Sequence, residues 1–369
     1  MNAQLPINQF KILHATGATL TRFGEVPNFN EGLYELGKGA YAWMVPNGSW
    51  GETNCGLIVG DGESVLIDTL WDLPYTRQMM SAIEPIVNTA PINTVVNTHS
   101  DGDHFWGNQL FPNRDIIATQ ACKDMMHHIS PKSMTALGKV GAVASKVPVF
   151  GANKIGNWFS GMVKPYDYSN IIITPANKTF TQELTLNVGG REVVLMEMGP
   201  AHTSGDAMVY LPDSKLLYTG DLLFIDSTPP LWAGPVENWI TAIDRMLEMD
   251  VDIFVPGHGA LTDRQGVIRV KDYWEFIYEE VSRRNKLGMP PAEIAREILF
   301  GSDIERLGFL KWDSPERLFL STHVLCKHLN GEGDKHQSTP EVFSILSKQG
   351  KLAHELPLCR PRCMHRLKH

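Results

Sequence analysis

Apolar residues in the first hundred positions form short runs that polar turns separate. Residues 54–70, NCGLIVGDGESVLIDTL, contain two such runs around a Gly-Asp-Gly turn, which predicts a β-hairpin whose second strand ends at Asp68. A helix is predicted over residues 73–85. The next run, INTVVNTHSDGDH, is a strand rich in β-branched residues that leads directly into a polar loop.

The alternation of strands and helices continues to about residue 200. IIATQ, from residue 116, leads into a helical segment, and IIITP, residues 171–175, has the composition of a further strand. LTLNVGGREVVLMEMG, residues 184–199, predicts a second hairpin with Gly-Gly at its turn. Strands that alternate with helices indicate a layered α/β fold.

Residues 133–170 interrupt this pattern. The segment is rich in glycine and small apolar residues, and its second half carries Phe150, Trp158 and Phe159. One interpretation is a surface excursion that packs partly on the body of the protein. The other is a mobile apolar flap over an active site, since long segments without regular structure are often functional lids.

After about residue 270 the pattern becomes helical, because Trp274, Ile277, Tyr278 and Val281 follow the spacing of one helix face. We therefore divide the chain into four parts. These are an N-terminal segment (1–39), an α/β domain (40–268), a helical extension (269–350) and a frayed basic tail (351–369). The helices of the extension are expected to cover one side of the domain, and they could also join two copies of the chain.

Composition restricts the partners of the chain. Thirty-three Lys and Arg against 41 Asp and Glu give a net charge of −8, which disfavours nucleic acid as a partner. No run of eighteen apolar residues predicts a membrane span, and the first residues have neither the basic nor the apolar region of a signal peptide. Five scattered cysteines do not form a disulfide framework. We expect a cytoplasmic protein that acts on a small molecule, without a membrane.

The loop after the third predicted strand concentrates potential metal ligands. Extended backbone sends alternate residues to one side, so His99, Asp101 and Asp103 can converge, and Gly102 allows the bend that brings His104 round. Imidazole and carboxylate groups suit zinc, iron or manganese. The alternative is that the acids only cap a helix and the histidines lie on the surface.

Three later segments favour the metal site over capping. GPAHTSGD contributes His202, LYTGD contributes Asp221 and VPGHG contributes His258, each after a β-type run and beside glycine. Four such strand ends are difficult to explain as caps. His128 and His328 lie on predicted helices, and we interpret them as surface or structural residues. The Gly-x-Ser-x-Gly pattern of serine hydrolases is absent.

From about residue 40 to 265 these motifs resemble, in order, those of the metallo-β-lactamase superfamily. The resemblance implies an αββα sandwich, with two sheets face to face and helices outside. It also implies ligands for two divalent metal ions. His99 and His202 match the first ion, Asp103, His104 and His258 match the second, and Asp221 matches the bridging carboxylate. Asp68 matches a residue that orients a ligand, and Thr203 and Thr219 are candidates for holding ligand neighbours.

One position departs from that pattern, because Asp101 stands where the superfamily loop has its second histidine. A carboxylate still binds a divalent ion but is harder than imidazole, which moves the preference from zinc towards manganese or iron. Zinc remains the first expectation. Asp101 is either a ligand or a neighbour of a site that holds a single ion.

The chemistry expected from this ligand set is hydrolysis by a metal-bound hydroxide, because a metal lowers the pKa of its bound water to about 7. Asp103 would bind a metal and also orient the nucleophile. The substrates expected are small esters, thioesters, lactones or amides. The alternatives are an iron-dependent oxidoreductase or dioxygenase and a non-catalytic binder with the same fold.

Overall fold

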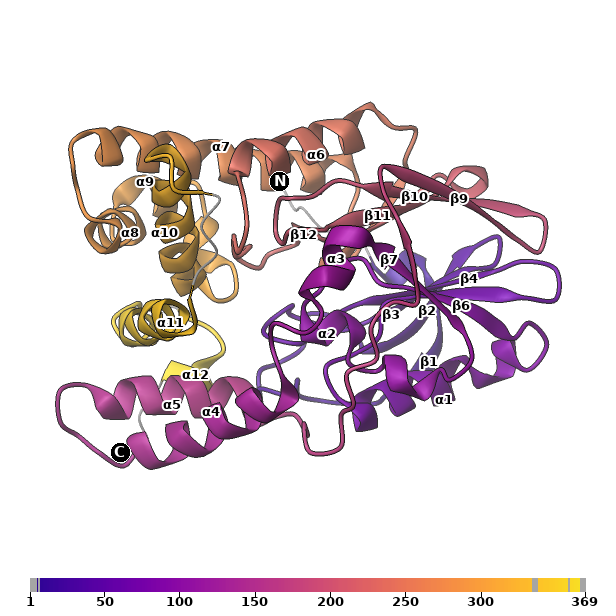
Figure 1. Cartoon of the computed structure of the whole chain (residues 1–369), viewed down its shortest axis with the longest axis horizontal. Helices are drawn as coiled ribbons and strands as arrows, with labels where there is room; N and C mark the ends of the chain where they lie inside the picture. The colour runs from indigo at the N-terminus through magenta and orange to yellow at the C-terminus, as the bar shows by residue number, and fades with distance from the viewer. Residues whose placement is uncertain (1–4, 6, 334–337, 358, 366–369) are drawn as a thin grey trace.

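The computed structural model describes residues 5, 7–333, 338–357 and 359–365, in which two β-sheets lie face to face with helices outside (Figure 1). The larger sheet has eight strands, in spatial order β1 (Lys11–Ala15), β2 (Gly32–Gly37), β3 (Ala40–Met44), β4 (Cys55–Val59), β5 (Ser64–Ile67), β6 (Ile92–Val96), β7 (Asp115–Thr119) and β8 (Lys178–Phe180). The smaller sheet has, in spatial order, β13 (Ile253–His258), β12 (Leu216–Phe224), β11 (Ala207–Leu211), β10 (Arg191–Glu197) and β9 (Glu183–Val188). The predicted αββα sandwich is confirmed.

Strand direction decides which loops meet. Strands β5 to β8 are parallel neighbours, and in the smaller sheet β12 and β13 are parallel. Parallel neighbours present their carboxyl ends at the same sheet edge. The core between the sheets is mainly aliphatic, and Val65, Val96, Leu195 and Val255 are buried in it. The loops after β6, β10 and β13 are therefore carried on a rigid, well-packed framework.

The predicted hairpins are present as β4–β5 and β9–β10, and the predicted helix is α1 (Leu73–Val87). Asp72 caps this helix by accepting a hydrogen bond from the Tyr75 backbone N at 2.7 Å. The strand predicted over residues 171–175 is wrong. Side chains of Asn108 and Gln109 bond the backbone of that segment in place of a neighbouring strand, and β8 begins only at Lys178.

Residues 11–37 contribute two strands that the sequence pattern did not predict. Strand β2 pairs with β3 and β1 pairs with β2, so the larger sheet extends into the N-terminal segment. Four of the five residues of β1 are exposed. Because an exposed edge strand lacks the alternation of a half-buried one, its sequence carried no strand signal.

Residues 133–170 form a helical hairpin, α4 (Pro131–Ala144) and α5 (Ala152–Val163), rather than irregular structure. The glycines that suggested a loop are packing positions. A Cβ on Gly156 would lie 2.3 Å from the Ser145 backbone N, and one on Gly141 would lie 2.8 Å from the Ser160 backbone N. Glycine thus allows the two helices to approach closely.

Helices α6 (Val236–Glu248) and α7 (Arg264–Lys286) pack on the smaller sheet (Figure 1). Beyond them lie α8 (Pro291–Leu299), α9 (Ser302–Arg306), α10 (Leu318–Leu329), α11 (Thr339–Ala353) and α12 (Arg362–His365). The prediction of a frayed tail is wrong over the described residues, because Leu352, Leu356 and Met364 are buried and α12 packs on α5. Hydrophobic burial, which charge counting does not register, holds this segment. Among the described residues, no helix combines the length and the hydropathy needed to cross a bilayer.

Candidate metal centre

Four histidines and three aspartates from distant parts of the chain converge between the two sheets. Two belong to the loop after β6, two to the short helix α2 (Gly102–Phe105), one to the loop after β10 and two to strands β12 and β13. In chain order they are His99, Asp101, Asp103, His104, His202, Asp221 and His258. The structure therefore brings together every residue that the sequence indicated as a metal ligand.

Asp221 lies at the centre of this cluster. Its Oδ2 atom is 3.3 Å from His202 Nε2 and 3.4 Å from His258 Nε2. The same atom is 3.7 Å from His99 Nε2, and Oδ1 is 3.1 Å from His104 Nε2. One carboxylate thus faces all four imidazoles.

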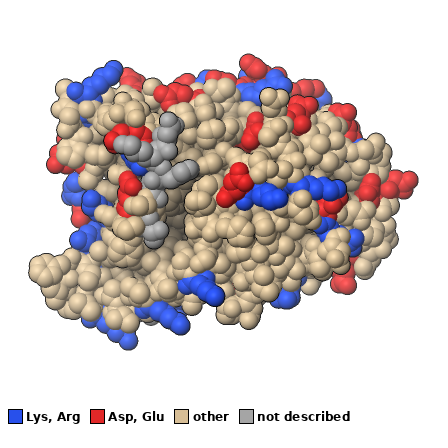
Figure 2. Space-filling view, viewed as in Figure 1, with Lys and Arg blue, Asp and Glu red and all other residues tan. Residues whose placement is uncertain are grey.

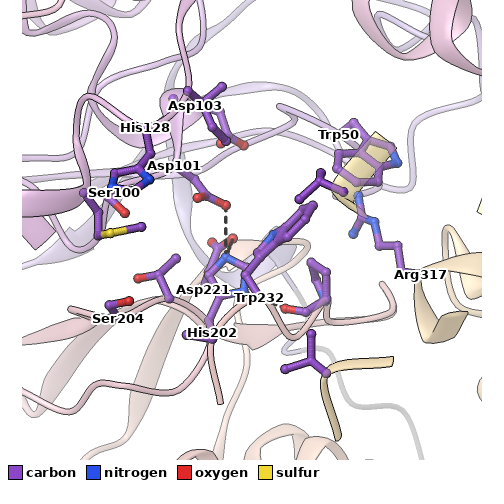
Figure 3. A pocket seen from close by; sticks show the side chains of 18 of the residues that line it. Trp50, Ser100, Asp101, Asp103, His128, His202, Ser204, Asp221, Trp232 and Arg317 are labelled. Atoms are coloured by element: carbon purple, nitrogen blue, oxygen red, sulfur yellow. Dashed lines mark hydrogen bonds and ion pairs between the residues drawn. The ribbon is translucent and has the colours of Figure 1, made fainter. Parts of the chain in front are cut away.

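The other two aspartates divide the cluster into two groups. Asp101 Oδ2 is 3.3 Å from His202 Nε2, and these two residues form one group with His99. Asp103 Oδ2 is 3.5 Å from His258 Nε2, and these two form another group with His104. In each group the three ligand atoms lie within 4.8 Å of one another. Figure 3 shows Asp101, His202 and Asp221 directed towards one another.

Unsatisfied polar atoms indicate that the site fits a cation. His99 Nε2, His104 Nε2 and Asp221 Oδ1 are buried and make no hydrogen bond of acceptable geometry with a described residue, although the last two atoms lie 3.1 Å apart. Such atoms are costly to bury unless a hydrogen bond or a metal ion satisfies them. Imidazole nitrogens and carboxylate oxygens are the donors that divalent transition metals prefer. The cluster is therefore able to bind metal ions.

Other side chains fix the ring orientations. Asp68 Oδ2 is 2.8 Å from His104 Nδ1, and the same carboxylate accepts hydrogen bonds of 2.7 Å from the Thr98 backbone N and hydroxyl. His202 Nδ1 lies 2.7 Å from the Pro230 carbonyl oxygen. These contacts leave the Nε2 atom of each ring directed into the cluster, which is the arrangement of metal-binding histidines.

Thr203 and Thr219 support the backbone beside the cluster. The Thr203 hydroxyl donates to Asp206 Oδ1 at 2.7 Å, and the Asp206 carboxylate also accepts from the Ala201 backbone N at 3.1 Å. The Thr219 hydroxyl donates to the Val255 carbonyl oxygen at 3.2 Å, which joins β12 to β13. Both threonines thus hold neighbours of His202 and Asp221 rather than the ligand rings.

The sequence analysis did not identify two residues that support the cluster. The Thr53 hydroxyl donates to Asp103 Oδ2 at 2.8 Å, and no motif marked Thr53, because only the fold brings the segment before β4 beside α2. Asp206 was visible in the GPAHTSGD segment but received no role. Its hydrogen bonds to the loop could have been anticipated from the preference of Asp for such turns.

The capping alternative is not supported for Asp101. Asp101 is the N-cap residue of α2, but its side chain makes no capping hydrogen bond. Gly102 begins α2 rather than bending the loop, and a Cβ there would lie 2.4 Å from the Trp106 ring. Asp221 lies inside β12 rather than at its end, where the pairing with β13 shifts register at Gly220. The prediction that Asp221 follows the end of a strand is therefore wrong.

The pKa values reflect the dense packing of opposite charges. Burial by itself would raise the pKa of Asp221, but the surrounding histidines hold it well below its usual range. Burial opposes protonation of His202, yet Asp101 and Asp221 raise the pKa of that ring to about 9. Asp221 and Asp68 likewise raise the pKa of His104, whereas burial and His104 lower that of His99. Since metals bind neutral imidazole, binding a cation would release protons here.

A cavity of about 640 Å³ adjoins the cluster, and Asp101, Asp103, His202, Asp221 and His258 form part of its lining. Much of the rest is apolar, including Trp50, Trp71, Trp106, Leu137, Met162 and Trp232. Figure 2 shows the surface hollowed between the helices at one end of the molecule. His128 and His328, interpreted from sequence as surface or structural residues, also line this cavity. Because Leu137 lies in α4 and Met162 in α5, the α4–α5 hairpin forms a wall of the cavity.

Known proteins share this architecture. A sec-alkylsulfatase of Pseudomonas sp., described as stereoselective and inverting, superposes with a TM-score of 0.56 at 16% identity, covering 89% of this chain and 66% of that one. A double mutant of a sec-alkyl sulfatase superposes with a TM-score of 0.59 at 20% identity, covering 85% of this chain and 52% of that one. These likenesses concern the fold.

Two curated proteins are similar in sequence. The alpha subunit of 2,4-dinitroanisole O-demethylase from Nocardioides sp. (strain JS1661) is 26% identical over 269 residues, which are 71% of this chain and 65% of the subunit. The chain therefore spans about two thirds of that relative. Metallo-beta-lactamase type 2 of Bacillus cereus is 23% identical over 59% of this chain and 71% of its own length. The profile of the Metallo-beta-lactamase superfamily matches residues 48–258, more than half of the chain, and the chain belongs to that superfamily.

Proposed function

We propose that the chain is a metal-dependent hydrolase, dinuclear and with zinc as the first candidate, that acts on a small ester, thioester, lactone or amide with an apolar body. One observation carries this proposal. Two groups of three ligand atoms flank Asp221 and face a largely apolar cavity. His99, Asp101 and His202 would hold one ion, Asp103, His104 and His258 the other, and Asp221 would bridge them.

Bound divalent ions supply a coordinated water with a pKa near 7 and polarise the bond to be broken. The chain supplies orientation and proton transfer. Asp103 Oδ2 accepts from the Thr53 hydroxyl at 2.8 Å and lies 3.5 Å from His258 Nε2, so its position is fixed. Burial favours a neutral carboxyl, but His104 and His258 lower the pKa of Asp103, which keeps its carboxylate ionised at neutral pH. It would orient the water and pass a proton to the leaving group.

The similar proteins widen the range of bonds to be tested. Their names specify a sulfate ester, the O-methyl group of 2,4-dinitroanisole and a β-lactam. In each of these three small molecules the group named contains a bond to oxygen or nitrogen that could be cleaved. A second candidate is an iron-dependent oxidoreductase, which Asp101 favours because a carboxylate in place of imidazole suits iron better than zinc.

A substrate panel with measured metal content tests this proposal. Chromogenic esters, thioesters, lactones, sulfate esters, aryl methyl ethers and β-lactams are incubated with purified protein before and after chelation. We expect at least one compound to be hydrolysed, activity to fall by about 100-fold or more on chelation, and zinc or manganese to restore it equally in air and under nitrogen.

Full hydrolysis by protein shown to contain no metal would overturn the proposal. Turnover restored only by iron, and only in air, would support the oxidoreductase instead. A cytoplasmic location, the exclusion of nucleic acid and membrane, and an association of two copies through the C-terminal helices stay predictions.

A further inference from the structure

Arg317 is a buried arginine in the wall of the cavity. It ends the short helix η5 (Pro315–Arg317), it is 2% exposed, and it lines the cavity together with the metal cluster. Figure 3 shows its guanidinium beside Trp50. A cation at this depth needs compensation from its surroundings, because removing a charge from water is costly.

Aromatic rings place this guanidinium close to the metal centre. Its Cζ atom is 4.5 Å from the Trp50 ring centroid and 5.9 Å from that of Phe224. The Phe224 ring stacks on His258 with 4.9 Å between centroids. Only the Phe224 ring therefore lies between the guanidinium and His258 of the metal cluster. One small molecule could contact both Arg317 and the cluster.

The hydrogen bonding of Arg317 is incomplete. Nη1 donates to the Ser227 hydroxyl at 3.1 Å and to the Thr228 carbonyl oxygen at 3.2 Å. Nε is buried and has no partner among the described residues. A guanidinium has five N–H donors, so most of its capacity is unused.

No carboxylate of the described residues lies within 4.0 Å of this guanidinium to form an ion pair. The two acids nearest in sequence bond to other groups. Asp313 accepts from the Ser314 hydroxyl at 2.7 Å, and Glu316 accepts from Trp158 Nε1 at 3.1 Å. Arg317 thus makes no direct ion pair with a described residue, and buried Asp313 and Glu316 balance its charge from a longer distance, which leaves its free N–H groups for a ligand in the cavity.

We propose that Arg317 binds an oxyanion of the substrate, so that the substrate is an organic anion with an apolar body and a carboxylate- or sulfate-like group. This inference rests on the proposed function, because it specifies the substrate class of the same site. A planar guanidinium matches such oxyanions with paired hydrogen bonds, and Trp50 keeps its plane oriented. The competing role is structural, in which Arg317 only ties the Ser227–Thr228 segment to Trp50.

Binding of an unreactive ligand pair separates these roles. Calorimetry measures 4-phenylbutyrate and the neutral 4-phenylbutanamide against metal-loaded protein, for wild type and Arg317→Met. We expect the variant to bind the carboxylate about tenfold or more weakly and the amide within about twofold of wild type, because a hydrogen-bonded charge pair is lost. Arg317→Lys, which keeps the charge, should recover part of the carboxylate affinity.

Arg269→Met is the matched control. Arg269 also lies over an aromatic ring, with Cζ 4.0 Å from the Phe309 centroid, and it donates to the Leu307 carbonyl oxygen, but it does not line the cavity. This variant should bind both ligands as wild type does. Metal content and thermal unfolding are measured for all variants.

Equal losses for carboxylate and amide in Arg317→Met, or an unchanged carboxylate affinity, would overturn the proposal. If the variant does not fold, the wild-type protein decides, since failure to prefer the carboxylate over the amide also overturns it. The readout needs no turnover. Absence of metal-dependent hydrolysis would therefore refute the proposed function, whereas the binding data would still decide whether Arg317 binds an oxyanion.

Discussion

The metal centre and the apolar wall face the same cavity but are built in opposite ways. The centre is polar, and its ligands lie in strands β12 and β13, in α2 and in loops that follow strands. The wall is mostly apolar and comes from segments as distant as Trp50, Leu137, Met162 and Leu346. The centre has paired charges whose positions are fixed by hydrogen bonds, whereas the wall provides volume.

This difference indicates that different residues determine the reaction and the choice of substrate. The ligands are held by hydrogen bonds such as that of Asp68 to His104, and His202 bonds to wall residues only through their backbone atoms, the Pro230 carbonyl oxygen and the Trp232 N. Fold alone does not determine the substrate of such a protein. Changes in the wall should therefore alter which molecule is accepted, and changes in the centre should alter whether any molecule reacts.

The largest effect is expected at the centre from Asp221→Asn. The carboxylate faces all four histidines, so its loss removes the negative charge that both ligand groups share. We expect kcat/KM to fall by about 1000-fold or more, since a metal contributes several kcal/mol to transition-state stabilisation. Steady-state kinetics with metal analysis checks this result for every substrate in the panel.

Asp101→Asn is the matched comparison, because the change is the same but Asp101 lies at the edge of one group, with its side chain 26% exposed. We expect a loss of about 10- to 100-fold. If Asp101→Asn were as damaging as Asp221→Asn, the central role of Asp221 would be refuted.

A smaller effect, confined to substrate choice, is expected in the wall from Trp232→Ala. The ring lines the cavity, while the backbone N of Trp232 donates to the His202 carbonyl oxygen at 3.0 Å and is retained in the variant. We expect kcat/KM to fall about tenfold for bulky apolar substrates and to change little for the corresponding acetates. Equal losses for both substrate sizes would show that wall and centre are not separable.

The smallest effect on activity is expected from Glu52→Gln, at a buried residue between Gly51, which lines the cavity, and Thr53, which bonds to Asp103. Burial and the nearby Asp313 raise the pKa of Glu52 from its usual 4.5 to about 8. A carboxyl whose pKa is raised on folding contributes stability that is complete below about pH 4.5 and is lost as the pH rises through about 8. Wild-type protein should therefore lose roughly 4 kcal/mol between about pH 5 and pH 9 from this group.

Glu52→Gln should remove that part of the pH dependence, because an amide does not ionise. Denaturant unfolding at several pH values measures the difference between variant and wild type, which should grow with pH and level off above about 8. Activity near neutral pH should change less than twofold. A difference that is constant with pH would contradict the raised pKa.

The sequence predicted the centre far better than the wall. His99 to His104 are adjacent in the chain and follow a recognisable strand, and His202, Asp221 and His258 each lie in a short motif with glycine. Gly257 shows why, since a Cβ there would lie 1.9 Å from Asp221 Oδ1. Such close approaches restrict residue type locally, which makes them visible in sequence.

The errors arose where residues far apart in the chain decide the structure. The glycines of residues 133–170 indicated a loop because their helix–helix contact is a tertiary one, and Leu356 and Met364 lay in a segment whose basic charge concealed its burial. Residues 171–175 have the composition of a strand but bond to side chains instead.

By itself, then, the sequence determined a layered α/β fold and a set of candidate ligands, because periodicity, turn residues and metal-binding side chains act over a few positions, while its resemblance to the superfamily implied the sandwich. Only the tertiary structure decided that Thr53 holds Asp103, that a helical hairpin walls the cavity and that Arg317 lines it without a direct ion pair to a described residue. The physical reason is that solvent exclusion and the pairing of buried charges depend on which distant segments pack together, and local patterns do not encode that packing.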